Sequence, residues 1–151
     1  MLESEPNRQE LDLRLFRVIR NMSTALFENI KRDVDSHGLG VETFQILELI
    51  YSTGAQPIQK ISERLSIPSG SITYVVDKLE NKNLVKRTPA PGDRRKTNVT
   101  LTDEGCAYFD EIFPKHAQTI SNNLSSVTDA EKFLLIDLLK KIGYGALENR
   151  P

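Results

Sequence analysis

The 151-residue sequence has a single cysteine, no tryptophan and only two histidines. With Cys106 as its one thiol, the chain forms no internal disulfide, which is typical of proteins in a reducing compartment. No apolar run approaches the roughly 20 residues that cross a bilayer. Residues 1–12 are too acidic and polar for a secretory signal peptide. We therefore expect a cytoplasmic protein that does not enter a membrane.

Residues that carry catalysis or bind metals are also scarce. The sequence contains no P-loop, HExxH, GxSxG or GxGxxG motif, and no residues have metal-ligand spacing. His37 and His116 belong to different predicted elements. Cys106 and His116 are ten residues apart, which places them about 80° apart around a straight helix and roughly 15 Å apart along its axis. We therefore expect no enzyme activity, no metal and no cofactor.

Charge is nearly balanced over the whole chain but not within it. The composition, 38% hydrophobic and 27% charged residues, fits one soluble globular domain. The net charge of −1 argues against non-specific coating of nucleic acid. Residues 60–101, however, carry nine Lys/Arg against four Asp/Glu, a net charge of +5, whereas the rest has 11 against 17, a net charge of −6. A local basic excess of this kind is typical of a nucleic-acid-binding segment.

The segment from residue 69 to residue 83 predicts a short amphipathic helix. One stripe of it is apolar and is formed by Ile72, Val75, Val76 and Leu79. We expect the Ser69 hydroxyl to cap the N-terminus and Asn83 to end the helix in a left-handed conformation. The other face can hydrogen-bond to bases or phosphates through Ser69, Ser71, Thr73, Tyr74 and Lys78. Alone, such a helix is either a DNA-reading helix or an ordinary solvated one.

Its neighbours favour the DNA-reading alternative. Before it, residues 58–65 predict a helix that starts after Pro57, and the turn at 66–68 completes a helix-turn-helix unit. After it, residues 84–88 and 97–101 predict two strands of a hairpin with a turn at 89–92. Arg94 and Arg95 are expected on its tip, where an arginine side chain suits the narrow minor groove of DNA. Asp93 can bond to an arginine two residues on, so we expect it to position the tip and not to contact DNA.

The run DKLENKNLVKR…GDRRKTNVTLTDEG resembles the winged-helix core of the MarR family of bacterial transcriptional regulators. The D-R-R tip followed by V-x-L-T-x-x-G is the most specific part of the resemblance. By position, Arg95 corresponds to the wing arginine that enters the minor groove, Asp93 to its partner, and residues 69–78 to the recognition helix. Tyr74 stands where members often have arginine, and Asn83 where they usually have glycine. The resemblance therefore does not transfer a base preference.

The resemblance implies a mainly α-helical fold with a small antiparallel β-wing. It implies an N-terminal dimerisation helix (1–36), a winged helix-turn-helix DNA-binding lobe (37–101) and C-terminal linker and dimerisation helices (102–151). It also implies a homodimeric, sequence-specific regulator, most often a repressor, on a pseudo-palindromic operator in double-stranded DNA. Release of the DNA by a small aromatic ligand or by thiol oxidation is the family's usual regulation.

The sequence patterns at both ends of the chain fit helices that pack against a second subunit. Apolar residues spaced through 11–34 predict a helix of about seven turns. Thr102 is expected to cap a helix that Pro114 kinks or breaks, and Thr128 to open the last helix with a capping box. A dense apolar stripe in that last helix is formed by Leu134, Leu135, Leu138, Leu139 and Ile142. We expect both ends to interlock with a second subunit.

Two features could regulate binding. Cys106 lies in the first turns of a predicted helix, where the dipole favours the thiolate and permits redox sensing. Lone cysteines are more often small buried hydrophobes, and oxidant-sensing family members more often carry their cysteine near the N-terminus. Aromatic residues that could line an effector crevice, or simply form core, are Phe16, Phe44, Tyr108 and Phe113.

The alternative function is a protein–protein interaction module on a winged-helix fold without DNA binding, since fold alone does not fix function. The overall acidity of the chain and the uncharged residue at Tyr74 favour this alternative. The paired Arg94 and Arg95 favour DNA, because a protein-binding wing has no need of them.

Overall fold

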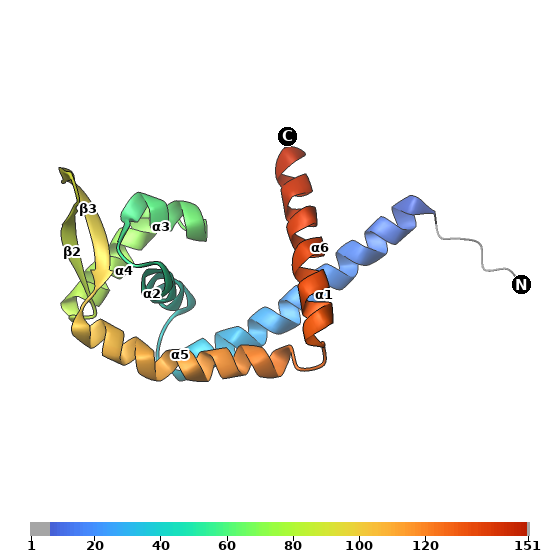
Figure 1. Cartoon of the computed structure of the whole chain (residues 1–151), viewed down its shortest axis with the longest axis horizontal. Helices are drawn as coiled ribbons and strands as arrows, with labels where there is room; N and C mark the ends of the chain where they lie inside the picture. Colours follow the sequence, from blue (N-terminus) through green and yellow to red (C-terminus); the bar gives the residue numbers. More distant parts are fainter. Residues whose placement is uncertain (1–6, 151) are drawn as a thin grey trace, which may run out of the picture. The chain divides into compact units, whose positions relative to one another are not determined.

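A computed structural model describes residues 7–150 of the chain (Figure 1). Six helices and three strands follow in these residues, and the fold is mainly α with a small antiparallel β-wing, as predicted. In chain order they are α1 (Arg8–Ser36), α2 (Val41–Thr53), β1 (Gln56–Pro57), α3 (Ile58–Leu65), α4 (Ser69–Asn81), β2 (Val85–Ala90), β3 (Asp93–Leu101), α5 (Asp103–Asn123) and α6 (Asp129–Glu148). The chain divides into two compact units, Met1–Ala117 and Gln118–Pro151. The three-part division expected from the sequence stays a prediction.

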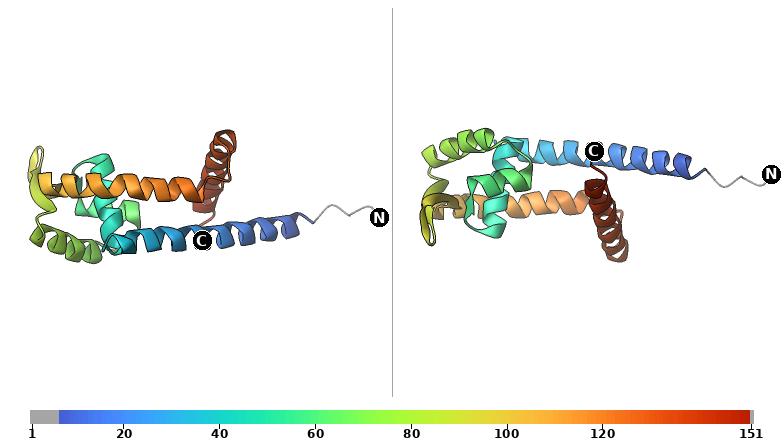
Figure 2. Two further views of the ribbon diagram at one scale, coloured as in Figure 1. Left: turned by 90° about the horizontal axis from the view of Figure 1, so that it is seen from below. Right: turned by 90° about the horizontal axis from the view of Figure 1, so that it is seen from above.

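The core of the first unit is built by α2, α3 and α4 together with the base of the wing, the end of α1 and one side of α5. Its fully buried side chains include Ile46 and Leu47 of α2, Ile61 of α3, Ile72 of α4 and Val99 of β3. Each such side chain contributes about 1.5–3 kcal/mol by leaving water. The three strands pair in the order β1–β3–β2, all antiparallel. The β2–β3 hairpin lies at one end of this unit, as Figures 1 and 2 show.

Helix α1 is long and mostly solvent-exposed. Its 29 residues bury only Val34, although apolar residues recur along its whole length. The predicted long N-terminal helix is confirmed. Within the first unit, Asp33 in the last turns of α1 contacts His116 in the middle of α5, and Phe44 of α2 packs against Phe109 and His116 of α5.

Helix α5 continues through Pro114, running from Asp103 to Asn123. A kink at the proline stays a prediction. Proline removes one N–H donor and crowds the carbonyl four residues before it. Packing of the flanking side chains offsets that loss, since Phe109, Ile112 and His116 on either side of Pro114 are all buried.

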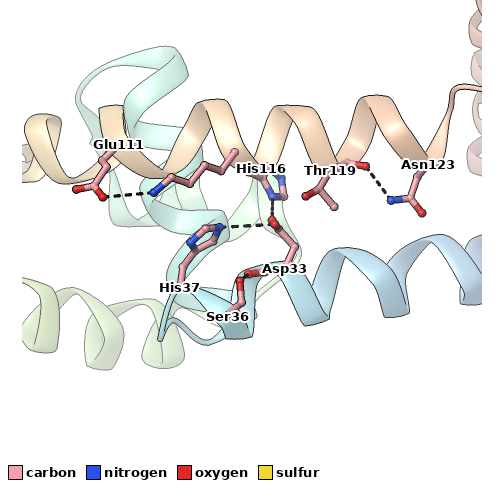
Figure 3. A network of polar contacts seen from close by, with 8 residues as sticks. Asp33, Ser36, His37, Glu111, His116, Thr119 and Asn123 are labelled. Atoms are coloured by element: carbon pink, nitrogen blue, oxygen red, sulfur yellow. Dashed lines mark hydrogen bonds and ion pairs between the residues drawn. The ribbon is translucent and has the colours of Figure 1, made fainter.

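A polar network joins α1, the following loop and α5 (Figure 3). His116 Nδ1 lies 2.7 Å from Asp33 Oδ2, and His37 Nε2 lies 3.6 Å from Asp33 Oδ1. The His116 ring also packs against Phe44 of α2 at a tilt of 50°, with 4.4 Å between ring centroids. The sequence separates Asp33 and His116 by 83 positions, and no local pattern pairs them.

The second unit contains α6, which begins with the predicted capping box. The Thr128 N–H donates to Glu131 Oε2 at 2.8 Å, and the Glu131 N–H donates to Thr128 Oγ1 at 3.4 Å. The bond from the Thr128 N–H, followed by a bond from the Thr128 hydroxyl to the same carboxylate oxygen at 2.8 Å, lowers the pKa of Glu131. No residue of α6 is buried. Its large apolar side chains are instead exposed: Phe133, Leu134, Leu135, Ile136, Leu138, Leu139, Ile142, Tyr144 and Leu147.

Candidate nucleic-acid interface

The helix-turn-helix unit is formed by α3, a three-residue turn and α4. Ser66 adopts a left-handed conformation with φ of 53° and ends α3. The Ser62 hydroxyl donates to the Ile67 carbonyl at 2.6 Å and ties the turn back to α3. Ile67 itself is buried, so the turn is anchored from both sides. These contacts fix the direction in which α4 leaves the turn.

The start of α4 differs from the prediction. Ser69 is the first helical residue and not the cap, because the N-cap position is Pro68, which makes no side-chain cap bond. The first helical bond runs from the Ile72 N–H to the Pro68 carbonyl at 3.1 Å, one residue earlier than expected. The Ser69 carbonyl accepts the Thr73 hydroxyl at 2.9 Å. The predicted apolar stripe of α4 is confirmed as buried.

The outer face of α4 carries the predicted reading residues. Ser69, Thr73, Tyr74 and Lys78 are exposed, and Ser71 is half-buried. The Lys78 ammonium lies 4.2 Å from the centroid of the Tyr74 ring. A cation over an exposed aromatic ring contributes about 0.5–1 kcal/mol. This contact holds a positive charge beside a 61%-exposed ring on the face that points away from the core.

The base of the wing is fixed by the start of α5. Asn83 is left-handed as predicted, with φ of 57°. Its carbonyl accepts the Thr102 hydroxyl at 2.6 Å, and the same hydroxyl oxygen caps α5 by accepting the Gly105 N–H at 2.9 Å. The Thr102 N–H in turn donates to the Leu84 carbonyl at 3.1 Å. The predicted cap of α5 is therefore confirmed, and it also holds the hairpin.

The hairpin is longer than predicted. β2 continues through Pro89 and Ala90, so only Pro91 and Gly92 form the turn, and Gly92 has a φ of 81°. Pro89 lacks an N–H donor, which the end of an edge strand tolerates. β3 begins at Asp93, four residues earlier than expected.

The register places the basic residues in an irregularity of the hairpin. Pro89 pairs with Thr97 and Ala90 with Asp93, so β3 has three more residues than β2 in this interval. Those three residues are Arg94, Arg95 and Lys96, and all are exposed. An interrupted ladder directs side chains away from the regular sheet. The paired arginines therefore lie beside the turn, within β3 and not in a separate tip loop.

Asp93 bonds to the residue two positions on. Its Oδ1 accepts the backbone N–H of Arg95 at 3.0 Å. A short side chain that bonds two residues ahead is typical of a tight turn. The bond acts on the backbone that carries Arg95, so a positioning role for Asp93 in DNA binding stays a prediction.

One residue of this interface is not singled out by the sequence pattern. Arg87 of β2 pairs with both Asp77 and Glu80 of α4. In the sequence it is merely one of several basic residues in the wing. Only the folded hairpin shows that its charge is turned toward α4.

Cys106 is exposed, so the interpretation of this residue as a small buried hydrophobe is wrong. It lies on the first turns of α5, four residues before Asp110. Asp110 Oδ1 accepts the Tyr51 hydroxyl at 2.6 Å. That bond, followed by burial and by the charges of Asp110 and Cys106, raises the pKa of Tyr51.

The four aromatic residues considered for an effector crevice do not gather at one site. Phe44 is 4% exposed and Phe16 is 62% exposed. Phe44 and Phe113 join a cluster through Phe109, with ring centroids 5.3 and 5.9 Å from that ring. Tyr51 completes it at 5.0 Å from Phe109. Tyr108 packs partly buried against the same core.

In residues 7–150, no three His, Cys, Asp or Glu side chains are arranged to hold a metal ion. Over the same described part of the chain, none of the helices has the length and apolar character needed to cross a membrane.

A helix-turn-helix unit with an exposed polar face and a basic wing defines a winged-helix, DNA-binding transcriptional regulator. The MarR family model matches residues 41–97. The HTH-type transcriptional regulator MhqR of Bacillus subtilis (strain 168) is 38% identical over 137 residues, covering 91% of this chain and 94% of that protein. The chain belongs to the MarR family and is a DNA-binding regulator, not an enzyme.

Solved structures share the fold of this chain. AbsC, a MarR family transcriptional regulator from Streptomyces coelicolor, superposes with a TM-score of 0.80 at 17% identity, covering 97% of this chain and 99% of AbsC. A mutant of MarR from E. coli complexed with operator DNA gives a TM-score of 0.72 at 23% identity, covering 90% of this chain and 98% of that one. These neighbours show the winged-helix fold.

Proposed function

We propose that the chain is a homodimeric repressor that acts in the cytoplasm on a pseudo-palindromic operator in double-stranded DNA. In this proposal α4 enters the major groove, where Ser69, Ser71, Thr73, Tyr74 and Lys78 meet base edges and phosphates. Arg94 and Arg95 enter the adjacent minor groove, and Asp93 holds the backbone at Arg95. The observation that carries the proposal is that the exposed polar face of α4 and the basic irregularity of β3 belong to one unit.

The dimer is proposed from the apolar surface of the chain's ends. α6 exposes nine large apolar side chains and buries none. α1 exposes a further set, comprising Leu11, Leu13, Leu15, Phe16, Val18, Met22 and Phe27. Exposed apolar side chains gathered along a single helix, as on each of these two, mark an interaction site. A second copy with two-fold symmetry would cover it and set the two α4 helices about one DNA turn, roughly 34 Å, apart.

The test is a salt-titrated gel-shift assay on DNA from the protein's own promoter. Arg95→Ala should weaken binding by about 1–3 kcal/mol because a minor-groove contact is lost. Lys78→Ala should reduce the slope of log K against log salt by about one if Lys78 meets a phosphate. Full binding by Arg95→Ala at moderate salt would remove the wing from the mechanism. Absence of binding by the wild type would instead favour the protein-interaction module.

Release of DNA is proposed to follow a small aromatic ligand or oxidation of Cys106. The exposure of Cys106 on the first turns of α5 supports the thiol route, and membership of the MarR family supports the aromatic one. Hydrogen peroxide and hydroxylated benzenes, added separately to preformed complexes of the wild type and Cys106→Ser, distinguish the routes. If peroxide releases DNA from the wild type but not from Cys106→Ser, oxidation of the thiol is the cause. If the aromatic compound releases DNA from both proteins, ligand binding is the cause. Failure of both removes this part of the proposal.

A further inference from the structure

Arg87 connects the wing to the recognition helix through two carboxylates. Its Nη2 lies 2.5 Å from Asp77 Oδ1, and its Nη1 pairs with Glu80 Oε2. The Arg87 backbone N–H also donates to Glu80 Oε1 at 3.2 Å. Asp77 and Glu80 are three residues apart on α4 and therefore lie on one side of it. Three bonds thus join one residue of β2 to one turn of α4.

Burial and charge distinguish Arg87 from the other basic residues of the wing. The Arg87 side chain is 26% exposed, whereas the other basic residues of the wing, Lys86, Arg94, Arg95 and Lys96, are exposed. The bond to Asp77 raises the pKa of Arg87 most, the charge of Glu80 adds to this, and burial opposes it. A planar guanidinium can bond two carboxylates at once, which an ammonium on a flexible stem does less well. Arg87 is engaged on both of its terminal nitrogens and faces α4.

The position of Arg87 in the hairpin allows its contacts to affect where Arg94 and Arg95 lie. Arg87 pairs in register with Val99, which is fully buried. Two residues further along β2, Pro89 begins the irregularity that contains Arg94 and Arg95. The chain between α4 and β2 is short, comprising Lys82, Asn83 and Leu84. Contacts at Arg87 therefore fix the direction in which the outer half of the hairpin leaves α4.

We propose that Arg87 is a positioning residue for DNA recognition, which holds the wing at a fixed angle to α4 without touching DNA itself. This inference rests on the proposed function, because it assigns Arg87 to the simultaneous fit of α4 and Arg95 into adjacent grooves. It also neutralises two acidic side chains on the reading helix. A contact residue and a positioning residue respond differently to salt and to a second mutation, which makes the two roles separable.

The experiment measures operator affinity and its salt slope for the wild type, Arg95→Ala, Arg87→Gln and the double variant. Arg87→Gln should bind about tenfold or more weakly, with the salt slope unchanged because no phosphate contact is lost. Arg95→Ala should cost much less in the Arg87→Gln background than in the wild type, since a misdirected wing no longer delivers Arg95. Lys86→Gln is the matched control, because it removes the same charge from an exposed neighbour and should leave the Arg95→Ala effect undiminished.

A second variant removes the contact from the helix side. Asp77→Asn with Glu80→Gln deletes two negative charges beside the DNA, so simple electrostatics predicts tighter binding. The positioning role predicts weaker binding and the same loss of coupling to Arg95→Ala. Thermal unfolding by circular dichroism confirms that each variant is folded. If Arg87→Gln unfolds, Arg87→Lys takes its place, with a smaller expected loss because it keeps the charge.

A measurement without DNA completes the test. Heteronuclear NOE values for the amides of residues 92–96 should fall in Arg87→Gln while those of α4 stay unchanged. A salt slope that drops by about one would make Arg87 a phosphate contact. Additive effects with Arg95→Ala, or unchanged wing NOE values, would also overturn the positioning role. Those results leave the proposed function intact, whereas failure of the wild type to bind its promoter overturns both.

Discussion

Gly105 lies directly against the carbonyl oxygen of Leu84, so that a Cβ atom added to Gly105 would be 1.9 Å from that oxygen. The contact joins the first turn of α5 to the residue before β2. Thr102 bonds to the carbonyls of both Asn83 and Leu84 at the same place. Thr102 and Gly105, the T-x-x-G end of the family motif, therefore hold the base of the wing against α5.

Gly105→Ala should therefore destabilise the first unit. No rotamer change relieves the clash, because the neighbour is backbone, so either α5 or the chain at Leu84 must move. We expect a loss of about 1–3 kcal/mol or more in the free energy of unfolding, measured by urea denaturation. Gly40→Ala is the control, since a Cβ there meets nothing within 4 Å and its φ is −80°. Equal stability of the two variants would show that the wing base tolerates displacement.

The pair formed by Asp33 and His116 should contribute to the same unit. His116→Ala removes one hydrogen-bond partner of a mostly buried carboxylate and the ring that packs against Phe44. We expect a loss of about 2–4 kcal/mol in the free energy of unfolding. Asp33→Asn keeps an acceptor for the imidazole N–H and should cost less than half as much. A larger loss for Asp33→Asn would mean that the charge, not the hydrogen bond, stabilises the pair.

These contacts mark the limit of what the sequence could predict. The stripe of Ile72, Val75, Val76 and Leu79 predicted α4, because helical periodicity is a local property that burial then uses. The capping box at Thr128 was predictable for the same reason, because it depends only on neighbouring residues. The Asp33–His116 pair and the Arg87 contacts were not predictable, since they depend on which distant elements the fold brings together. Ser69 was misplaced by one residue because both Pro68 and Ser69 suit the start of a helix.

The hairpin illustrates the same division between local and distant signals. Pro and Gly at 89–92 correctly indicated a turn, but the strand pairing decides where a strand ends. β3 continues along β2 as far as Asp93, and the extra residues accumulate at Arg94, Arg95 and Lys96. Residue types cannot reveal such an irregularity without the register. The exposure of Cys106 similarly depends on how α5 packs.

The capping box predicts a pH dependence of α6. The folded-state pKa of Glu131 lies below its usual value, so its charge stabilises the fold above the unfolded-state pKa of about 4.3 and this contribution is lost as pH falls through the folded-state pKa. Wild type should have a higher Tm than Glu131→Gln at neutral pH, and the difference should close below about pH 4. In a Thr128→Ala background the difference should shrink but persist, because the Thr128 N–H, whose bond contributes most, still donates to the Glu131 carboxylate. A difference that persists in acid would exclude the carboxylate as its cause.

The apolar surface of α6 should mediate dimerisation. Leu138→Glu places a charge among exposed apolar side chains that a second subunit is proposed to cover, and burying it would cost several kcal/mol. Sedimentation velocity should show a shift from dimer toward monomer at micromolar concentration. Lys141→Glu, an exposed charge reversal on the same helix, serves as the control. An unchanged dimer in Leu138→Glu would place the interface elsewhere.

In the proposed complex, two copies of α4, each with its wing, read one duplex together. Hydroxyl-radical and methylation-interference footprints of the wild type on its own promoter test this most directly. We expect two major-groove patches about one helical turn, 10–10.5 base pairs, apart and related by approximate two-fold symmetry, with flanking minor-groove protection that Arg95→Ala removes. A single unpaired patch, or protection that Arg95→Ala leaves unchanged, would contradict it.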